Sequence, residues 1–211
     1  MGSEDRLALV TFASDVTTLL TFTSMNDEGK TRAFSVLDTM RPTSATNLWG
    51  GVDQGLTLFD TLDVSVPAEY RNAALFVLTD GMPNVHPPRG EVAMVQVRAS
   101  STPIPIHTFG FGYRLDSRLL VDMAIAGHGS YCFIPDAGMV GTIFIHAWAN
   151  LKTWNDISSC WSRLAGRLGM SRPMWRRTSL VCSTGVPSGI LTNTWMKSLG
   201  TFGKGENFTQ P

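Results

Sequence analysis

The sequence predicts an open, mostly parallel α/β sheet with one antiparallel edge strand and helices on both faces. Short apolar runs alternate along the chain with segments whose apolar residues recur every three or four positions. The run at residues 73–79 is almost wholly apolar, which is typical of a parallel strand that helices cover on both faces. Only three residues join the two earliest runs, and so short a connection requires an antiparallel pair.

Two strands and two helices are expected within the first sixty residues. The strands are residues 7–12 and 16–22. Ser24 followed by Asp27 resembles a helix N-cap box, and the helix that it would start ends before Pro42. The second helix would bury apolar residues at helical spacing, namely Leu48, Val52, Leu56 and Phe59.

Strands and helices alternate through the rest of the patterned region. The expected elements are strand 73–79, helix 89–101, strand 104–109, a helix ending at Gly127 and strand 131–134. Pro105 must lie near the start of its strand or at an edge, because proline cannot donate to the ladder. The last helix shows the clearest apolar stripe of the chain, formed by Val140, Ile143, Phe144, Ala147 and Leu151.

The zero net charge conceals two unlike segments. Residues 1–150 contain 9 basic and 15 acidic side chains, whereas residues 151–211 contain 8 basic and 2 acidic ones. Four of the six tryptophans also lie in the second segment. We therefore expect one organised domain over residues 4–151 and a basic, Trp/Ser/Thr-rich, poorly ordered tail over residues 152–211.

Composition and termini exclude several classes of protein. With 43% hydrophobic residues in 211, the chain can form a core, yet no apolar run reaches the ~18 to 20 residues of a membrane-spanning helix. The first residues contain no apolar signal core, so we expect a cytoplasmic location and no membrane partner. Cys132, Cys160 and Cys182 are odd in number and widely spaced, which indicates neither a disulfide framework nor a zinc cluster.

Two polar residues fall where such sheets bind ligands, at the carboxyl ends of strands. Asp80 directly follows the strand at residues 73–79, and Thr46 lies in a loop just before a helix. A carboxylate and a hydroxyl together suit a hard divalent cation such as Mg²⁺. Each residue also has a simpler interpretation, since Asp80 could be a turn residue and Thr46 a helix N-cap.

The order of elements, together with three segments, resembles a von Willebrand factor type A domain, a Rossmann-like fold. These segments are Asp5–Phe12, Thr46-Asn47-Leu48 and Leu78-Thr79-Asp80-Gly81, and the resemblance covers residues 4–151. It implies a metal-ion-dependent adhesion site. Thr46 would match the threonine that coordinates the metal, and Asp80 the aspartate that usually reaches it through water. Asn47 and Gly81 would belong to the supporting loops.

The chain departs from the family pattern in one respect. The family's first strand, which ends in Asp-x-Ser-x-Ser and supplies the other metal ligands, is missing from this sequence, as is its following helix. That strand normally lies between the strands at residues 6–13 and 73–79, so its loss would leave two apolar edges open to aggregation or to another chain, unless they close on each other. Thr46 and Asp80 alone would leave about four of six Mg²⁺ positions to water, so we expect weak metal binding.

No enzymatic activity is expected. The sequence lacks a nucleophile elbow and a phosphate loop, and no acid or base is identifiable beside Asp80 for a hydrolase. Three functions remain open. The first is a non-enzymatic protein-interaction module that presents a degenerate metal site to an acidic residue of a partner. The others are a truncated chain without independent activity and a nucleic-acid contact through the basic tail. The oligomeric state is not predicted.

Overall fold

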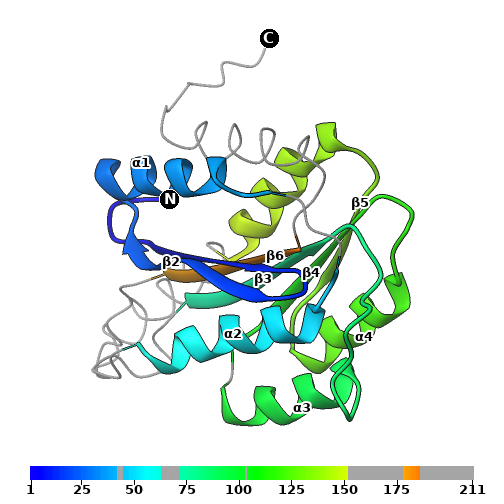
Figure 1. Ribbon diagram of the computed structural model, residues 1–211. Coiled ribbons are helices and arrows are strands. Elements are labelled where there is room, and N and C mark those ends of the chain that lie inside the picture. The colour runs from blue at the N-terminus through cyan, green and yellow to red at the C-terminus, as the bar shows by residue number, and fades with distance from the viewer. Residues whose placement is uncertain (42–44, 63–71, 103, 152–177, 186–211) are drawn as a thin grey trace, which may run out of the picture.

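The computed structural model describes residues 1–41, 45–62, 72–102, 104–151 and 178–185 (Figure 1). Its six strands form one sheet in the order β2-β1-β6-β3-β4-β5. Only β1 and β2 pair in antiparallel fashion, and every other neighbouring pair is parallel. The strands are β1 (Arg6–Phe12), β2 (Val16–Ser24), β3 (Asn72–Thr79), β4 (Ile106–Phe111), β5 (Tyr131–Ile134) and β6 (Thr178–Gly185). The predicted fold class is therefore confirmed.

Helices cover both faces of the sheet, as Figure 1 shows. The lower layer in that view contains α2 (Leu48–Asp60), α3 (Glu91–Ser101) and α4 (Ser117–Ala126). The upper layer contains α1 (Asp27–Asp38) and a helix over residues 140–151. Within the described residues, no helix is long and apolar enough to cross a bilayer.

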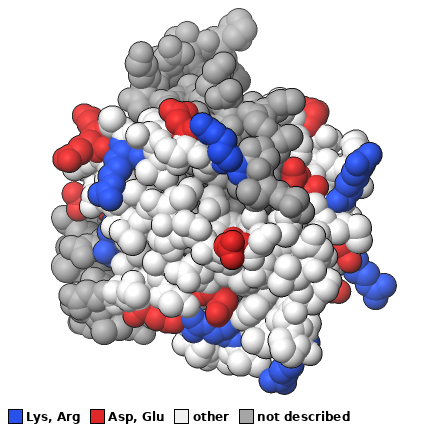
Figure 2. Space-filling view, viewed as in Figure 1, with Lys and Arg blue, Asp and Glu red and all other residues white. Residues whose placement is uncertain are grey.

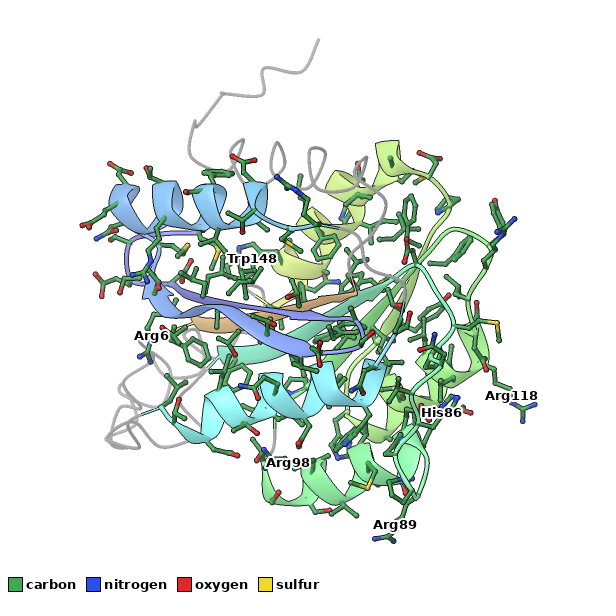
Figure 3. All side chains as sticks on the ribbon, in the orientation of Figure 1. Arg6, His86, Arg89, Arg98, Arg118 and Trp148 are labelled. Carbon is green, nitrogen blue, oxygen red and sulfur yellow. The ribbon has the colours of Figure 1, made fainter. Side chains whose placement is uncertain are left out.

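Two apolar clusters, one on each face of the sheet, explain why the sequences of β1 and β3 are continuous apolar runs. In β3, Ala74, Phe76 and Leu78 pack into the cluster beneath the upper helices, which also contains Trp148 (Figure 3). The alternate residues of β3 pack against the lower helices; they are Ala73, Leu75 and Val77. Because successive side chains point to opposite faces, a strand covered on both faces needs apolar residues at every position.

The start of α1 differs from the prediction. Ser24 is the last residue of β2, and Asn26 caps the helix by accepting a hydrogen bond from the Gly29 backbone N–H at 2.8 Å. Asparagine is as good an N-cap as serine, and the chain must first leave β2 before it can turn into the helix. The proline prediction is correct, since β4 begins directly after Pro105.

The centre of the sheet departs most from expectation. β6 lies between β1 and β3 and pairs in parallel with both, so that Leu180 is opposite Leu7 on one side and Ala74 on the other. Eight residues of the segment that we expected to be poorly ordered therefore occupy the position of the missing strand. Neither β1 nor β3 is left with an open edge. The rest of that segment, residues 152–177 and 186–211, lies outside the described residues.

The physical reason lies in the two strands that flank the gap. Unpaired backbone N–H and C=O groups along two buried apolar strands are costly, and any segment of the chain that can adopt extended structure lowers that cost by pairing with both. The run Thr178-Ser179-Leu180-Val181-Cys182 mixes β-branched and apolar residues, which favour strands.

Candidate metal and partner site at the carboxyl edge of the sheet

The candidate site lies at the edge of the sheet where β1, β6 and β3 end. Asp80 directly follows β3, and Thr46 lies two residues before the start of α2. The carboxyl end of β6 reaches the same edge, because Thr184 pairs with Leu78 and Gly185 pairs with Phe12. Parallel pairing thus brings segments that are far apart in sequence to one edge.

Backbone hydrogen bonds fix the loop that carries Thr46. The Thr46 N–H donates to Asn84 Oδ1 at 2.9 Å, and the Asn84 N–H donates to the Thr46 carbonyl at 3.2 Å. On its other side, the Asn47 N–H donates to the carbonyl of Ala13, which follows β1, at 2.9 Å. The loop is therefore tied both to the end of β1 and to the loop between β3 and α3.

The Thr46 hydroxyl lies beside the residue that follows Asp80. A Cβ atom added to Gly81 would lie 3.3 Å from Thr46 Oγ1, which is tighter than ordinary van der Waals contact. Gly81 therefore allows the two loops to approach closely. The Gly81 N–H also faces Thr79 Oγ1 at 3.4 Å, so the buried Thr79 hydroxyl helps to fix the turn after β3. The structure thus places Thr46 Oγ1 beside Gly81, the residue that follows Asp80.

Asn47 has a structural role that is distinct from that of Thr46. Its side chain caps α2 by accepting a hydrogen bond from the Gly50 N–H at 2.9 Å. Thr46 is therefore not the N-cap, and the simpler interpretation of that threonine is wrong. Because Asn47 satisfies the helix end, the Thr46 hydroxyl is not needed as a cap.

The donor set at this site contains hard oxygen atoms and little charge. In the described ranges, no group of three or more His, Cys, Asp and Glu side chains could hold a metal ion. Asp80, which precedes Gly81, offers a carboxylate, and Thr46 offers a hydroxyl. Oxygen donors of these two kinds fit Mg²⁺ in type, but two of them are far fewer than the six that the ion prefers.

Asn84 is the site residue that the sequence analysis missed. It comes four residues after Asp80 in a loop without periodicity, and its partner Thr46 is 38 positions away in the sequence. No spacing rule connects the two. The only available signal was its residue type, because asparagine is a common turn residue that bonds to backbone groups.

His107, His86 and Cys132 have surroundings that do not indicate metal binding. His107, near the amino end of β4, lies toward the opposite edge, where the Ser130 N–H faces its Nδ1 at 3.2 Å. Burial lowers the pKa of His107 and favours its neutral form. His86 Nδ1 forms a hydrogen bond of 2.6 Å with Oε1 of Glu91, the first residue of α3. Burial also raises the pKa of the Cys132 thiol, which opposes formation of a reactive thiolate.

A hollow of about 320 Å³ lies next to the candidate site, between the β1–β2 turn and the end of α1. Asp15 and Arg41 contribute charged groups to its wall, and Phe12 contributes an apolar surface. Ala13 also lines it, and the Ala13 carbonyl is the one that accepts from Asn47. The hollow therefore adjoins the loop that holds Thr46.

Comparison with known proteins identifies the family. A family model described as the von Willebrand factor type A domain matches residues 1–133. The chain belongs to the von Willebrand factor type A family. Its type A domain is 29% identical over 133 residues to inter-alpha-trypsin inhibitor heavy chain H3 of Pongo abelii and of Homo sapiens. The match covers 61% of this chain and 15% of each relative.

Solved structures agree with this assignment at the level of the fold. A von Willebrand factor type A protein from Catenulispora acidiphila superposes with a TM-score of 0.55 at 17% identity, over 64% of this chain and 30% of the other. The conserved hypothetical protein BatB from Bacteroides thetaiotaomicron also gives 0.55, at 18% identity, over 72% of this chain and 82% of the other. At such identities the likeness shows the type A fold alone.

Proposed function

We propose that this type A domain is a non-enzymatic protein-interaction module that holds a divalent cation at Thr46 and Asp80 and presents it to an acidic residue of a partner. Type A domains are generally protein-interaction modules, and the family match supports that class. The observation that carries the metal proposal is the close approach of Thr46 Oγ1 to Gly81 at the end of β3. It brings two loops with hard oxygen donors together at the carboxyl edge of a parallel sheet, where such folds bind ligands.

The residues present fit Mg²⁺ in donor type but form an incomplete set. Thr46 would supply a hydroxyl oxygen, and Asp80 a carboxylate that contacts the ion directly or through water. A bound cation would supply positive charge for a partner carboxylate. With so few protein ligands, we expect the affinity for Mg²⁺ to be weak.

Thermal unfolding of the full chain with excess Mg²⁺ and with chelator tests the metal proposal. A ligand present at ~100 times its dissociation constant adds about 2.7 kcal/mol to the free energy of unfolding. For a chain of this size, that corresponds to a rise in Tm of roughly 5 to 11 °C. We expect a rise of this order in the native sequence and little or none in Thr46→Val and Asp80→Asn.

Matched controls separate the site from general effects of charge and stability. Asp122→Asn and Thr31→Val change the same residue types at exposed positions on α4 and α1, and both should retain the Mg²⁺ effect. A cooperative transition that Mg²⁺ does not move would contradict the metal proposal and leave the interaction module intact. The absence of any cooperative transition would instead favour the alternative of a truncated chain without independent activity.

The third hypothesis, a nucleic-acid contact through the basic tail, gains no support from the described residues. The arginines on which it depends lie at residues 163–177, outside the described part of the chain. It remains a prediction of the sequence alone, and a binding affinity that falls steeply with salt would test it.

A further inference from the structure

Two exposed aromatic rings lie beside each other at the carboxyl edge of β4 and β5. Tyr113 is 82% exposed and Phe133 is 38% exposed, and their ring centroids are 5.4 Å apart in an edge-to-face arrangement. The loop that carries Tyr113 is anchored to β5, because the Gly112 N–H donates to the Ile134 carbonyl at 2.9 Å. Fixed, exposed aromatic residues are the side chains that most often anchor a protein partner.

Two exposed arginines lie in the segment of chain that follows Tyr113. Arg114 follows Tyr113 directly, and Arg118 lies in the first turn of α4. Neither forms an ion pair with any residue of the described ranges. Asp116, which lies between them, is engaged as the N-cap of α4 and accepts from the Leu119 N–H at 2.9 Å. Figure 2 shows basic side chains projecting from the right-hand rim of the molecule, and Figure 3 labels Arg118 on that side.

Residues 112–118 contain two arginines and one aspartate, which gives this segment a net charge of +1. Residues 1–150 contain 9 basic and 15 acidic side chains. Arg98, by contrast, is held by Asp53 at 3.2 Å and Asp60 at 2.7 Å and so serves to join α3 to α2. Two exposed arginines that form no ion pair among the described residues, on an acidic domain, are complementary to negative charge on another molecule.

The same edge of the sheet carries the candidate metal site. β3, β4 and β5 are consecutive parallel strands, with Thr79 opposite Gly110 and Gly110 opposite Phe133. Neighbouring strands lie ~4.8 Å apart, so the ends of β3 and β5 are separated by roughly 10 Å. An extended peptide advances about 3.3 Å per residue and would cross that distance in about three residues.

We infer that Tyr113, Arg114, Arg118 and Phe133 form a docking surface for an acidic protein segment with an apolar side chain. The segment would place an aromatic or aliphatic residue against the Tyr113 and Phe133 rings and carboxylates beside the two arginines. The residue that meets Thr46 and Asp80 would lie about three positions away. This inference rests on the proposed function, because it specifies the partner that the same edge would bind.

Fluorescence anisotropy with the full chain and a designed probe tests the inference. The probe is a labelled twelve-residue peptide in which Asp and Glu surround a central Phe-Leu pair. We expect Arg114→Glu and Arg118→Glu each to weaken binding about three- to tenfold at low salt, and Tyr113→Ala to weaken it by a similar factor. Added salt should weaken binding to the native sequence, because exposed charges are screened. The same peptide with Lys in place of the acidic residues should not bind.

A matched charge reversal gives the control. Arg32 is exposed on α1, away from this edge, and Arg32→Glu changes the net charge by the same amount as each test variant. Failure of the acidic probe to bind, or equal losses in Arg32→Glu and Arg118→Glu, would overturn the inference. Repeating the titration with chelator tests the proposed function separately. A chelator effect without an arginine effect overturns only the docking surface, and an arginine effect without a chelator effect overturns only the metal site.

Discussion

At the scale of single residues, Asn84 joins the two loops of the candidate site through two hydrogen bonds. Its side-chain carbonyl accepts from the Thr46 backbone N–H, and its own N–H donates to the Thr46 carbonyl. These two bonds join the loop before α2 to the loop after β3. The distance between the Thr46 hydroxyl and Asp80 therefore depends on a residue that would not itself contact the metal.

Replacing Asn84 with alanine should affect both stability and metal response. The substitution removes the acceptor for the Thr46 N–H, a loss of about 1 kcal/mol in the free energy of unfolding. Because the loop is then held by one bond fewer, the rise in Tm with Mg²⁺ should also diminish. Differential scanning fluorimetry with and without Mg²⁺ measures both effects.

Asn84→Asp provides the control for this prediction. The carboxylate keeps an acceptor in the same place, so this variant should retain the stability that Asn84→Ala loses. Equal Mg²⁺ responses in the native chain and in Asn84→Ala would show that the contact does not position Thr46.

At this scale the sequence predicts part of the site. The sequence predicts that Thr46, Asp80 and Gly81 meet at one edge of the sheet, where the carboxyl ends of parallel strands lie. Of this set, the structure gives the close approach of Thr46 to Gly81. Asn84 could not be predicted, because a hydrogen bond between two loops leaves no periodic pattern in the sequence. The separate roles of Asn47 and Thr46 also required the structure, since either residue type can cap a helix.

Among the elements, the beginning of α1 is set by one capping residue. Asn26 Oδ1 accepts from the Gly29 N–H, while Ser24 still pairs with Arg6 in the sheet. Both residues belong to types that cap helices, so sequence alone does not distinguish them. The deciding factor is that β2 continues to Ser24 in order to pair along the length of β1.

The capping assignment predicts different outcomes for two alanine variants. Asn26→Ala should lower the free energy of unfolding by about 1 kcal/mol, because the helix loses the partner of an N-terminal N–H group. Ser24→Ala should change it by less than about 0.5 kcal/mol, as is usual for surface substitutions. Urea denaturation curves of the two variants measure the difference. A larger loss in Ser24→Ala than in Asn26→Ala would contradict the assignment.

For the molecule as a whole, the central feature is β6. Among the strands that the structure describes, β6 alone lies between the β2-β1 pair and the β3-β4-β5 sheet. It pairs with β1 through every residue except Thr178, and with β3 through every residue except Gly185. The stability of the entire sheet should therefore depend on eight residues distant from the rest of the domain in sequence.

A proline in β6 tests this dependence. Val181→Pro removes a backbone donor from the middle of a central strand, where proline is not tolerated, and should cost at least about 3 kcal/mol. The Tm should fall by roughly 6 °C or more, or cooperative unfolding should be lost. Val181→Ile keeps the N–H group and the branched side chain and should unfold close to the native Tm. A proline variant as stable as the isoleucine variant would show that β6 does not hold the sheet together.

The sequence predicts the patterned elements well and the closure of the sheet not at all. The runs that form β1 and β3 are recognisable because each face of those strands requires apolar residues. β6 is not recognisable, because Leu180-Val181-Cys182 is a short apolar run within a segment that lacks periodicity. Its strand conformation follows from pairing with β1 and β3 on either side. Pairing between segments so far apart in sequence is a tertiary effect.

The position of β6 in the sequence also affects how the chain folds during its synthesis. β1 ends at Phe12, whereas the strand that pairs beside it ends at Gly185, about 170 residues later. At the usual rate of about 5 to 20 residues per second, a ribosome needs roughly 10 to 35 s to produce that interval. Until β6 has been synthesised, β1 and β3 each lack the neighbour that pairs with them in the finished sheet. We therefore expect chaperones to bind the newly synthesised chain until β6 has been made and has paired with β1 and β3.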